Sequence, residues 1–186
     1  MLLIKKLIIL LTFIFFQSLA YGSIKNSVIH NLLSTENINF NFEQNINGKI
    51  ETGNCTIEYP KKIFCNYNLE NEKILISDGK SLVIKTKYKS YYRYPLEKTP
   101  LYFILDKNFL IEEIKKLNER IIDSKFINFK IYKNENEINI FFDKKQFNII
   151  GWQTIDIYQN LNITHLTSIN KNIKIKKNLF KIPPKD

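Results

Sequence analysis

The chain has 186 residues, of which 44% are hydrophobic and 13% aromatic, and its formal net charge is +10 at pH 7. This length allows one domain with a sizeable core. The basic surplus suits a polyanion or an anionic lipid surface, but the lysines are spread along the chain, as A/T-rich codon usage also produces. No arginine cluster or interleaved basic and aromatic motif is present, which argues against a nucleic-acid partner.

The N-terminus has the organisation of an export signal. Two lysines precede an uncharged stretch from Leu7 to Phe16, and Ser18-Leu19-Ala20 places small residues where a leader peptidase cuts. We therefore expect residues 1–20 to be a signal peptide and residues 21–186 to form a single domain in the periplasm. An uncleaved anchor is the alternative, although the apolar run is shorter than the roughly 20 residues of a spanning helix. No Leu-x-x-Cys follows the signal, so we expect no lipid anchor.

The next segments predict a helix followed by a strand. From Ile24 to Leu33, apolar residues at helical spacing predict a short amphipathic helix. Its apolar side is expected to hold Ile24, Val28, Ile29, Leu32 and Leu33. Beyond Ser34 the period changes to two, and Ile38, Phe40 and Phe42 alternate with polar residues. This alternation is typical of a strand with one apolar face.

The two cysteines fall in a predicted hairpin. A turn at Pro60 would place Cys55 opposite Cys65 and Ile57 opposite Ile63. In a non-hydrogen-bonded pair the Cα separation of about 4.5 Å suits a disulfide. We expect a cross-strand disulfide that contributes roughly 2 to 3 kcal/mol, with two buried free thiols as the alternative. Redox catalysis is less expected because no Cys-x-x-Cys is present.

A second hairpin and two helices follow. Strands over residues 73–77 and 81–88 flank Asp78-Gly79, which predicts a type I′ turn, and Tyr91 to Tyr94 forms a further strand. Thr99-Pro100 predicts a helix start, with a capping hydroxyl followed by proline at the first helical position. Another helical pattern runs from about Lys107 to Asn118.

The remaining chain predicts only strands, separated by turn residues. They cover residues 121–124, 128–133, 137–143, 147–152, 154–159, 162–168 and 172–176. About ten or eleven antiparallel strands with three helices predict a mainly β fold in which a curved sheet is covered by helices on its concave side. Such a shell can enclose a cavity, although periodicity alone favours a packed core.

No catalytic or metal-binding constellation is present in the sequence. The only histidines, His30 and His165, lack a companion at metal-ligand spacing, and we expect His30 on a helix surface and His165 on a strand face. Gly-x-Ser-x-Gly, His-Glu-x-x-His and Gly-x-x-x-x-Gly-Lys are absent. We expect no enzyme activity, no metal and no cofactor, with a hydrolase assembled from distant segments as the alternative.

Six segments, in order along the chain, together resemble the periplasmic outer-membrane lipoprotein carrier family, LolA. They are Phe40-Asn41-Phe42-Glu43-Gln44, Tyr59-Pro60, Ser77-Asp78-Gly79-Lys80, Tyr94-Pro95-Leu96 with Thr99-Pro100-Leu101, Gly151-Trp152, and Phe180 with Pro183-Pro184. The resemblance implies a curved, incomplete antiparallel β-barrel with a hydrophobic cavity closed by helices.

The resemblance also implies which residues meet the cargo. The expected acyl-binding residues are Phe40, Phe42, Ile57, Tyr59, Ile63 and Tyr67, with Leu101, Ile104 and Leu105 on the lid. Carriers of this family often have arginine directly before the hairpin proline, where it holds the lid. Tyr59 stands there in this chain, and its hydroxyl lacks the charge and forked geometry of guanidinium. The resemblance therefore does not decide whether Tyr59 can hold the lid as the family's arginine does.

The implied function is transport of acyl chains. The implied partners are acylated lipoproteins, an inner-membrane lipoprotein-releasing ABC transporter and an outer-membrane receptor lipoprotein, with the carrier itself a monomer. A carrier of another lipid is one alternative. A periplasmic regulator that senses lipid or protein through the same fold is another.

Overall fold

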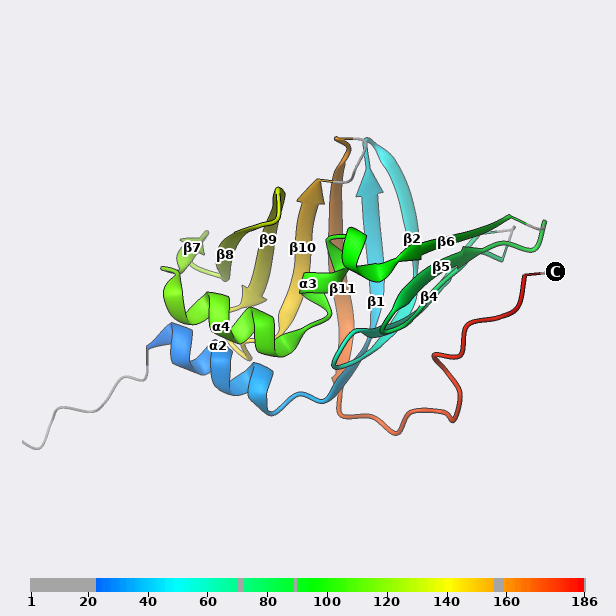
Figure 1. Cartoon of the computed structure of the whole chain (residues 1–186). Helices are drawn as coiled ribbons and strands as arrows, with labels where there is room; N and C mark the ends of the chain where they lie inside the picture. Colours follow the sequence, from blue (N-terminus) through cyan, green and yellow to red (C-terminus); the bar gives the residue numbers. More distant parts are fainter. Residues whose placement is uncertain (1–22, 70–71, 89, 156–158, 186) are drawn as a thin grey trace, which may run out of the picture.

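The computed structural model describes residues 23–69, 72–88, 90–155 and 159–185, and the predicted signal peptide, residues 1–20, lies outside them. Within this part of the chain, eleven antiparallel strands form one sheet that curves but does not close (Figure 1). The strand order is β6-β5-β4-β3-β2-β1-β11-β10-β9-β8-β7, so every neighbour is sequential except the β1–β11 pair. The predicted mainly β fold with a few helices is confirmed.

The strands follow one another as short hairpins on either side of the β1–β11 pair. The first half comprises β1 (Asn37–Ile46), β2 (Lys49–Glu58), β3 (Lys62–Tyr67), β4 (Ile74–Asp78), β5 (Ser81–Lys85) and β6 (Tyr91–Pro95). The second comprises β7 (Arg120–Ile122), β8 (Phe126–Lys133), β9 (Asn136–Asp143), β10 (Ile149–Ile155) and β11 (Leu161–Lys171). Pairing of β1 with β11 places Phe42 opposite Leu166 and joins the two halves.

The helices lie on the concave side of the sheet (Figure 1). They are α2 (Ile24–Leu33), the 3₁₀ turn η1 (Leu96–Lys98), α3 (Leu101–Ile104) and α4 (Lys107–Lys116). The Ser23 hydroxyl accepts a hydrogen bond from the Asn26 N–H at the start of α2 (3.2 Å), and Asp106 caps α4 by accepting from the Phe109 N–H (3.1 Å). The Lys107 ammonium donates to the Thr35 carbonyl (2.8 Å) and links α4 to the end of α2.

Apolar burial follows the predicted periodicities. On β1, Ile38, Phe40 and Phe42 are buried, and on the helices the buried side chains include Val28, Leu32, Leu110, Ile111 and Ile114. These helix residues form one hydrophobic cluster with the inward faces of β8 and β9. Among the described helices, none is long and apolar enough to cross a membrane.

Three local predictions are wrong: one about the apolar side of α2, one about a turn and one about a helix cap. Leu33 was expected on the apolar side of α2 but is 58% exposed, because it lies at the end of the helix. In the β4–β5 turn φ is positive at Gly79 but at neither Asp78 nor Lys80, whereas a type I′ turn needs a positive φ at both central residues. Thr99 does not cap α3, since its hydroxyl donates backwards to the Leu96 carbonyl (2.8 Å).

Two predictions about the later strands are also wrong. Strands were expected over residues 147–152 and 154–159, but a single strand, β10, spans residues 149–155, and residues 156–158 lie outside the described part. Residues 172–176 form no strand. Instead, the Asn37 side chain bonds to the backbone of Ile173 through both its Oδ1 and its Nδ2, and this holds the chain where it leaves β11.

Candidate ligand-binding cavity

A cavity of about 370 Å³ lies between the concave face of the sheet and the η1–α3 segment. This volume is within the range of small-molecule sites, about 300 to 1,000 Å³. Six of the residues expected from the sequence line it: Phe40, Phe42, Ile63, Tyr67, Leu101 and Ile104. The first four come from β1 and β3 and the last two from α3, so the sheet supplies the floor and α3 the lid.

Three other expected residues are not at the cavity wall. Ile57 and Leu105 are 1% and 0% exposed and belong to the packed core. Tyr59 borders a separate void of about 10 Å³ together with Leu32 and Ile38. Burial raises the pKa of the Tyr59 hydroxyl, and in the described part of the chain its side chain makes no hydrogen bond to α3.

Sequence reasoning missed several apolar residues of the cavity wall. Leu75, Leu82 and Ile84 on β4 and β5, Tyr94 on β6 and Trp152 on β10 also line it. Leu82, Val83 and Ile84 form a continuous apolar run, so the local sequence does not show which of them faces the cavity, and the pairing of distant strands decides which side chains meet. The Trp152 and Phe40 rings make a T-shaped contact with ring centroids 6.2 Å apart.

The floor of the cavity holds a disulfide. Cys55 and Cys65 are opposite each other on β2 and β3, with Cα atoms 4.0 Å apart, and their sulfur atoms are bonded. The predicted hairpin register and disulfide are confirmed. Both cysteines line the cavity.

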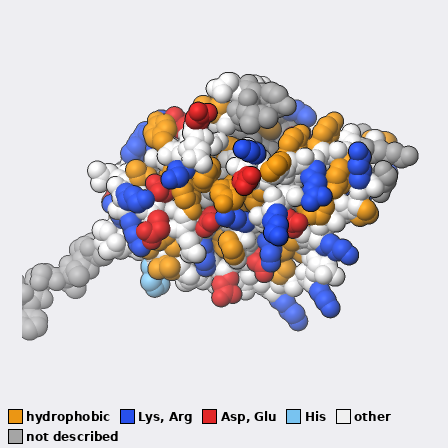
Figure 2. Space-filling model, viewed as in Figure 1, with side chains coloured by type: hydrophobic (Ala, Val, Ile, Leu, Met, Phe, Trp, Pro, Cys, Tyr) orange, Lys and Arg blue, Asp and Glu red, His pale blue; other side chains and the backbone are white. Residues whose placement is uncertain are grey.

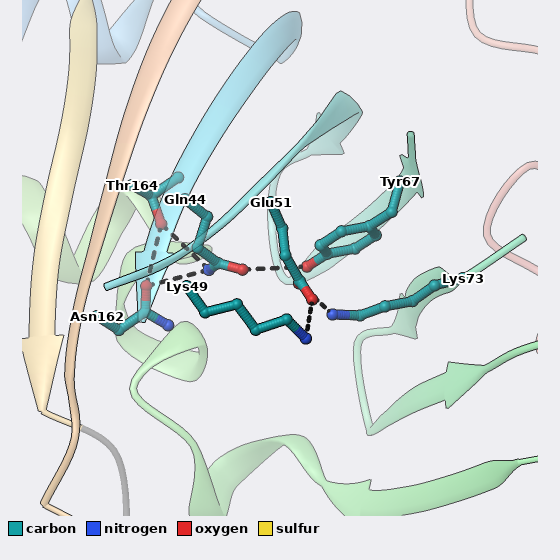
Figure 3. A network of polar contacts seen from close by, with 7 residues as sticks. All are labelled: Gln44, Lys49, Glu51, Tyr67, Lys73, Asn162 and Thr164. Atoms are coloured by element: carbon teal, nitrogen blue, oxygen red, sulfur yellow. Dashed lines mark hydrogen bonds and ion pairs between the residues drawn. The ribbon is translucent and has the colours of Figure 1, made fainter. Parts of the chain in front are cut away.

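Polar side chains of the cavity wall and beside it form a connected network around Gln44 (Figure 3). Gln44 on β1 lies opposite Glu51 on β2 and Thr164 on β11. The Gln44 amide donates to Asn162 Oδ1 (3.1 Å) and to the Thr164 hydroxyl (3.3 Å), and its Oε1 accepts from the Tyr67 hydroxyl (3.4 Å). We call the set Gln44, Glu51, Tyr67, Lys73, Thr154, Asn162 and Thr164 the polar row.

A buried carboxylate lies in the polar row. Glu51 is 4% exposed and forms ion pairs with Lys49 (2.9 Å to Oε1) and with Lys73 through Oε2. Burial alone would raise the pKa of the Glu51 carboxyl, but hydrogen bonds and charges from Lys73 and Lys49 outweigh it and hold the pKa below its ordinary value of 4.5. The Lys73 ammonium is also 4.0 Å from the centre of the Tyr67 ring. Burial, together with the Glu51 charge, raises the pKa of Tyr67.

The lid is tethered to the β2–β3 turn through Lys61. Its N–H donates to the Leu105 carbonyl (2.7 Å), and its ammonium lies 3.3 Å from Asp106 Oδ2 and 3.9 Å from the centre of the Tyr102 ring. The hydrogen bond to Tyr102 raises the pKa of Lys61, burial opposes this, and Asp106 raises it further. Asp106 also caps α4, so one carboxylate joins the lid, the helix and the turn.

The described residues include no group of three or more His, Cys, Asp or Glu side chains arranged to hold a metal ion. His30 and His165 are exposed. Figure 2 shows lysine and arginine side chains spread across the helix-bearing face among acidic and hydrophobic ones, not gathered in one patch.

A family model described as outer membrane lipoprotein carrier protein LolA matches residues 34–183. The chain belongs to the LolA family. This is a family of carriers that act in the periplasm. No curated protein sequence matches the chain.

Solved structures share the fold of this LolA-family chain. An uncharacterized conserved protein from Thermus thermophilus is 7% identical with a TM-score of 0.51, over 90% of this chain and 96% of that one. A domain named for outer membrane lipoprotein sorting, from Vibrio parahaemolyticus, is 6% identical with a TM-score of 0.50, over 85% of this chain and 94% of that one. At these identities the similarity establishes the fold alone.

Proposed function

We propose that this LolA-family protein carries the acyl chains of lipoproteins through the periplasm. In this proposal residues 1–20 are removed on export, and residues 21–186 act as a monomeric single domain. An inner-membrane lipoprotein-releasing ABC transporter loads the carrier, and an outer-membrane receptor lipoprotein unloads it. The observation that carries the proposal is the cavity of about 370 Å³, walled mainly by apolar side chains, in a member of a carrier family.

The physical need for such a cavity is clear from transfer energies. Burying an acyl chain contributes about 0.8 kcal/mol per CH₂, so a chain that left the membrane unprotected would meet a large barrier. In the proposal, Phe40, Phe42, Ile63, Tyr67, Leu101 and Ile104 contact the chain, and Ile57 and Leu105 support them from the core. No nucleotide-binding loop is present in the sequence, so the transporter supplies the energy of loading.

Trp152 makes ligand binding directly measurable. It is the single tryptophan of the chain and lines the cavity. Titration of the purified protein with a synthetic diacylated lipopeptide should change its fluorescence in a saturable way. Ile84→Phe, which fills part of the cavity, should weaken binding several-fold. Ile163→Phe is the matched control, because Ile163 is 43% exposed and alternates with the inward-facing Asn162 and Thr164.

The transport step needs a separate test in cells. Depletion of the protein should leave lipoproteins at the inner membrane. A saturable titration without this defect would favour a carrier of another lipid. Failure of every acylated ligand to alter the Trp152 emission would overturn the proposal and favour a regulator that binds a protein partner.

A further inference from the structure

We propose that the ligand of this cavity is an acyl amphiphile with an anionic head, a carboxylate or a phosphate, which Lys73, Lys98 and the uncharged side chains of the polar row bind. This inference rests on the acyl-chain binding of the proposed function, and not on the acyl chain belonging to a lipoprotein. It adds the chemistry of the head group and the residues that recognise it.

The first observation is the sign of the charges around the cavity. Two lysines, Lys73 and Lys98, are among the lining residues, whereas no aspartate or glutamate of the described chain lines the cavity. Glu51 lies beside the lining and offsets only part of this charge, since it is shared between Lys49 and Lys73. Lys98 has no ion pair within the described part of the chain. A negative head group would therefore complete the charge balance.

The second observation is a pair of buried donors that lack partners. Trp152 and Thr154 are each 6% exposed and line the cavity from β10. Neither the indole N–H nor the Thr154 hydroxyl has a hydrogen-bond partner among the described residues. Buried polar groups left unpaired are costly, and most are satisfied by a protein group, a water or a ligand. Ester, amide or carboxyl oxygens of a bound amphiphile would satisfy both.

The third observation is the position of these groups relative to the apolar walls. Along β1 the lining side chains are Phe40, Phe42, Gln44 and Ile46, and along β10 Trp152 is followed by Thr154, so polar groups are set among apolar walls. The apolar walls can hold a chain while the polar groups face its attached head. Lys73 donates one of its three N–H groups to Glu51, so donors remain for an anion.

The experiment compares single-chain lipids that share one acyl chain and differ only in the head. Monoacylglycerol is neutral, monoacylglycerol phosphate carries a phosphate, and the free fatty acid carries a carboxylate. Trp152 fluorescence should report at least about tenfold tighter binding of an anionic lipid than of the neutral one, as expected for a charge-assisted contact. The phosphate and carboxylate arms identify which anion is preferred.

Two variants should shift this preference in opposite directions. Lys73→Met should weaken binding of the anionic lipid about tenfold and change binding of monoacylglycerol less than twofold. Glu51→Gln keeps the side-chain shape, releases both lysines and should tighten anionic binding several-fold. Lys115→Met is the matched control, because this exposed lysine on α4 also pairs with a glutamate. If Lys73→Met fails to fold, the Glu51→Gln result alone decides.

The outcomes separate this inference from the proposed function. Equal affinity for neutral and anionic lipids, or equal losses for both in Lys73→Met, overturns the anionic head group while acyl-chain binding stands. Absence of binding by all three lipids and by the lipopeptide overturns the proposed function itself.

Discussion

At the scale of single residues, Glu51 is the unusual group of this molecule. A carboxylate that is 4% exposed is costly unless charges or donors compensate it. Lys49 and Lys73 provide that compensation from two sides. Because the net effect lowers the pKa of Glu51, the folded state favours its charged form. The associated stability is therefore present above pH 4.5 and lost as the pH falls through the folded-state pKa.

We expect Glu51→Gln to remove this pH dependence. At pH 6 the variant should have a free energy of unfolding about 1 to 3 kcal/mol below that of the wild type, because a charge-assisted hydrogen bond is lost. The difference should shrink as the pH is lowered below 4.5 and through the folded-state pKa of Glu51, because protonated Glu51 no longer holds the lysines. Urea unfolding at several pH values measures it. Glu43→Gln, an exposed neighbour on β1, is the control, and a constant difference at all pH values would contradict the prediction.

At the scale of elements, the lid depends on its tether. α3 has only four residues, and a helix this short is not stable alone. Its position is set by the Lys61 N–H bonded to Leu105, and by the Lys61 ammonium between Asp106 and Tyr102. Tyr59 carries no positive charge to hold the lid. Lys61, two residues further along the chain, supplies that charge.

Lys61→Met should loosen the lid without unfolding the protein. Loss of one partly exposed ion pair and one cation–π contact costs about 1 kcal/mol. Amide hydrogen exchange of α3 should therefore become roughly two- to fivefold faster. Lys62→Met, which removes the neighbouring Lys62–Glu58 ion pair, should leave α3 unchanged. Equal exchange at α3 in the wild type and in Lys61→Met would show that the backbone contact alone holds the lid.

Local pattern and long-range pairing account for what the sequence could and could not predict. Alternation on β1 and the Cys55–Cys65 register depend on neighbours within one hairpin, and both were predicted correctly. The polar row depends on the β1–β11 pair, which brings Gln44 beside Thr164, and no local pattern encodes that pairing. The Thr99 cap was predicted wrongly because the Thr99 hydroxyl bonds instead to the Leu96 carbonyl, which belongs to the preceding 3₁₀ turn.

At the scale of the whole molecule, one end of the sheet is buried on both faces. Leu75 and Leu82 line the cavity, whereas their neighbours Ile76 and Val83 lie on the opposite face and are 2% and 0% exposed. The C-terminal segment runs along this side of the sheet (Figure 1), and there the Tyr91 hydroxyl donates to the Pro183 carbonyl (3.2 Å). Phe180 of this segment is buried. The segment that was expected to begin as a strand therefore covers apolar residues of the convex face.

Phe180→Ala should destabilise the fold while sparing the cavity. Truncation of a mostly buried phenylalanine costs about 2 to 4 kcal/mol, which urea unfolding would detect as a lower midpoint. Leu179→Ala, at the more exposed neighbouring position, should cost less and serves as the control. Lipid binding measured by Trp152 fluorescence under native conditions should stay within twofold of the wild type, because the C-terminal segment and the cavity lie on opposite faces of β4 and β5. Loss of lipid affinity in a folded Phe180→Ala protein would mean that the two faces are energetically coupled through these strands.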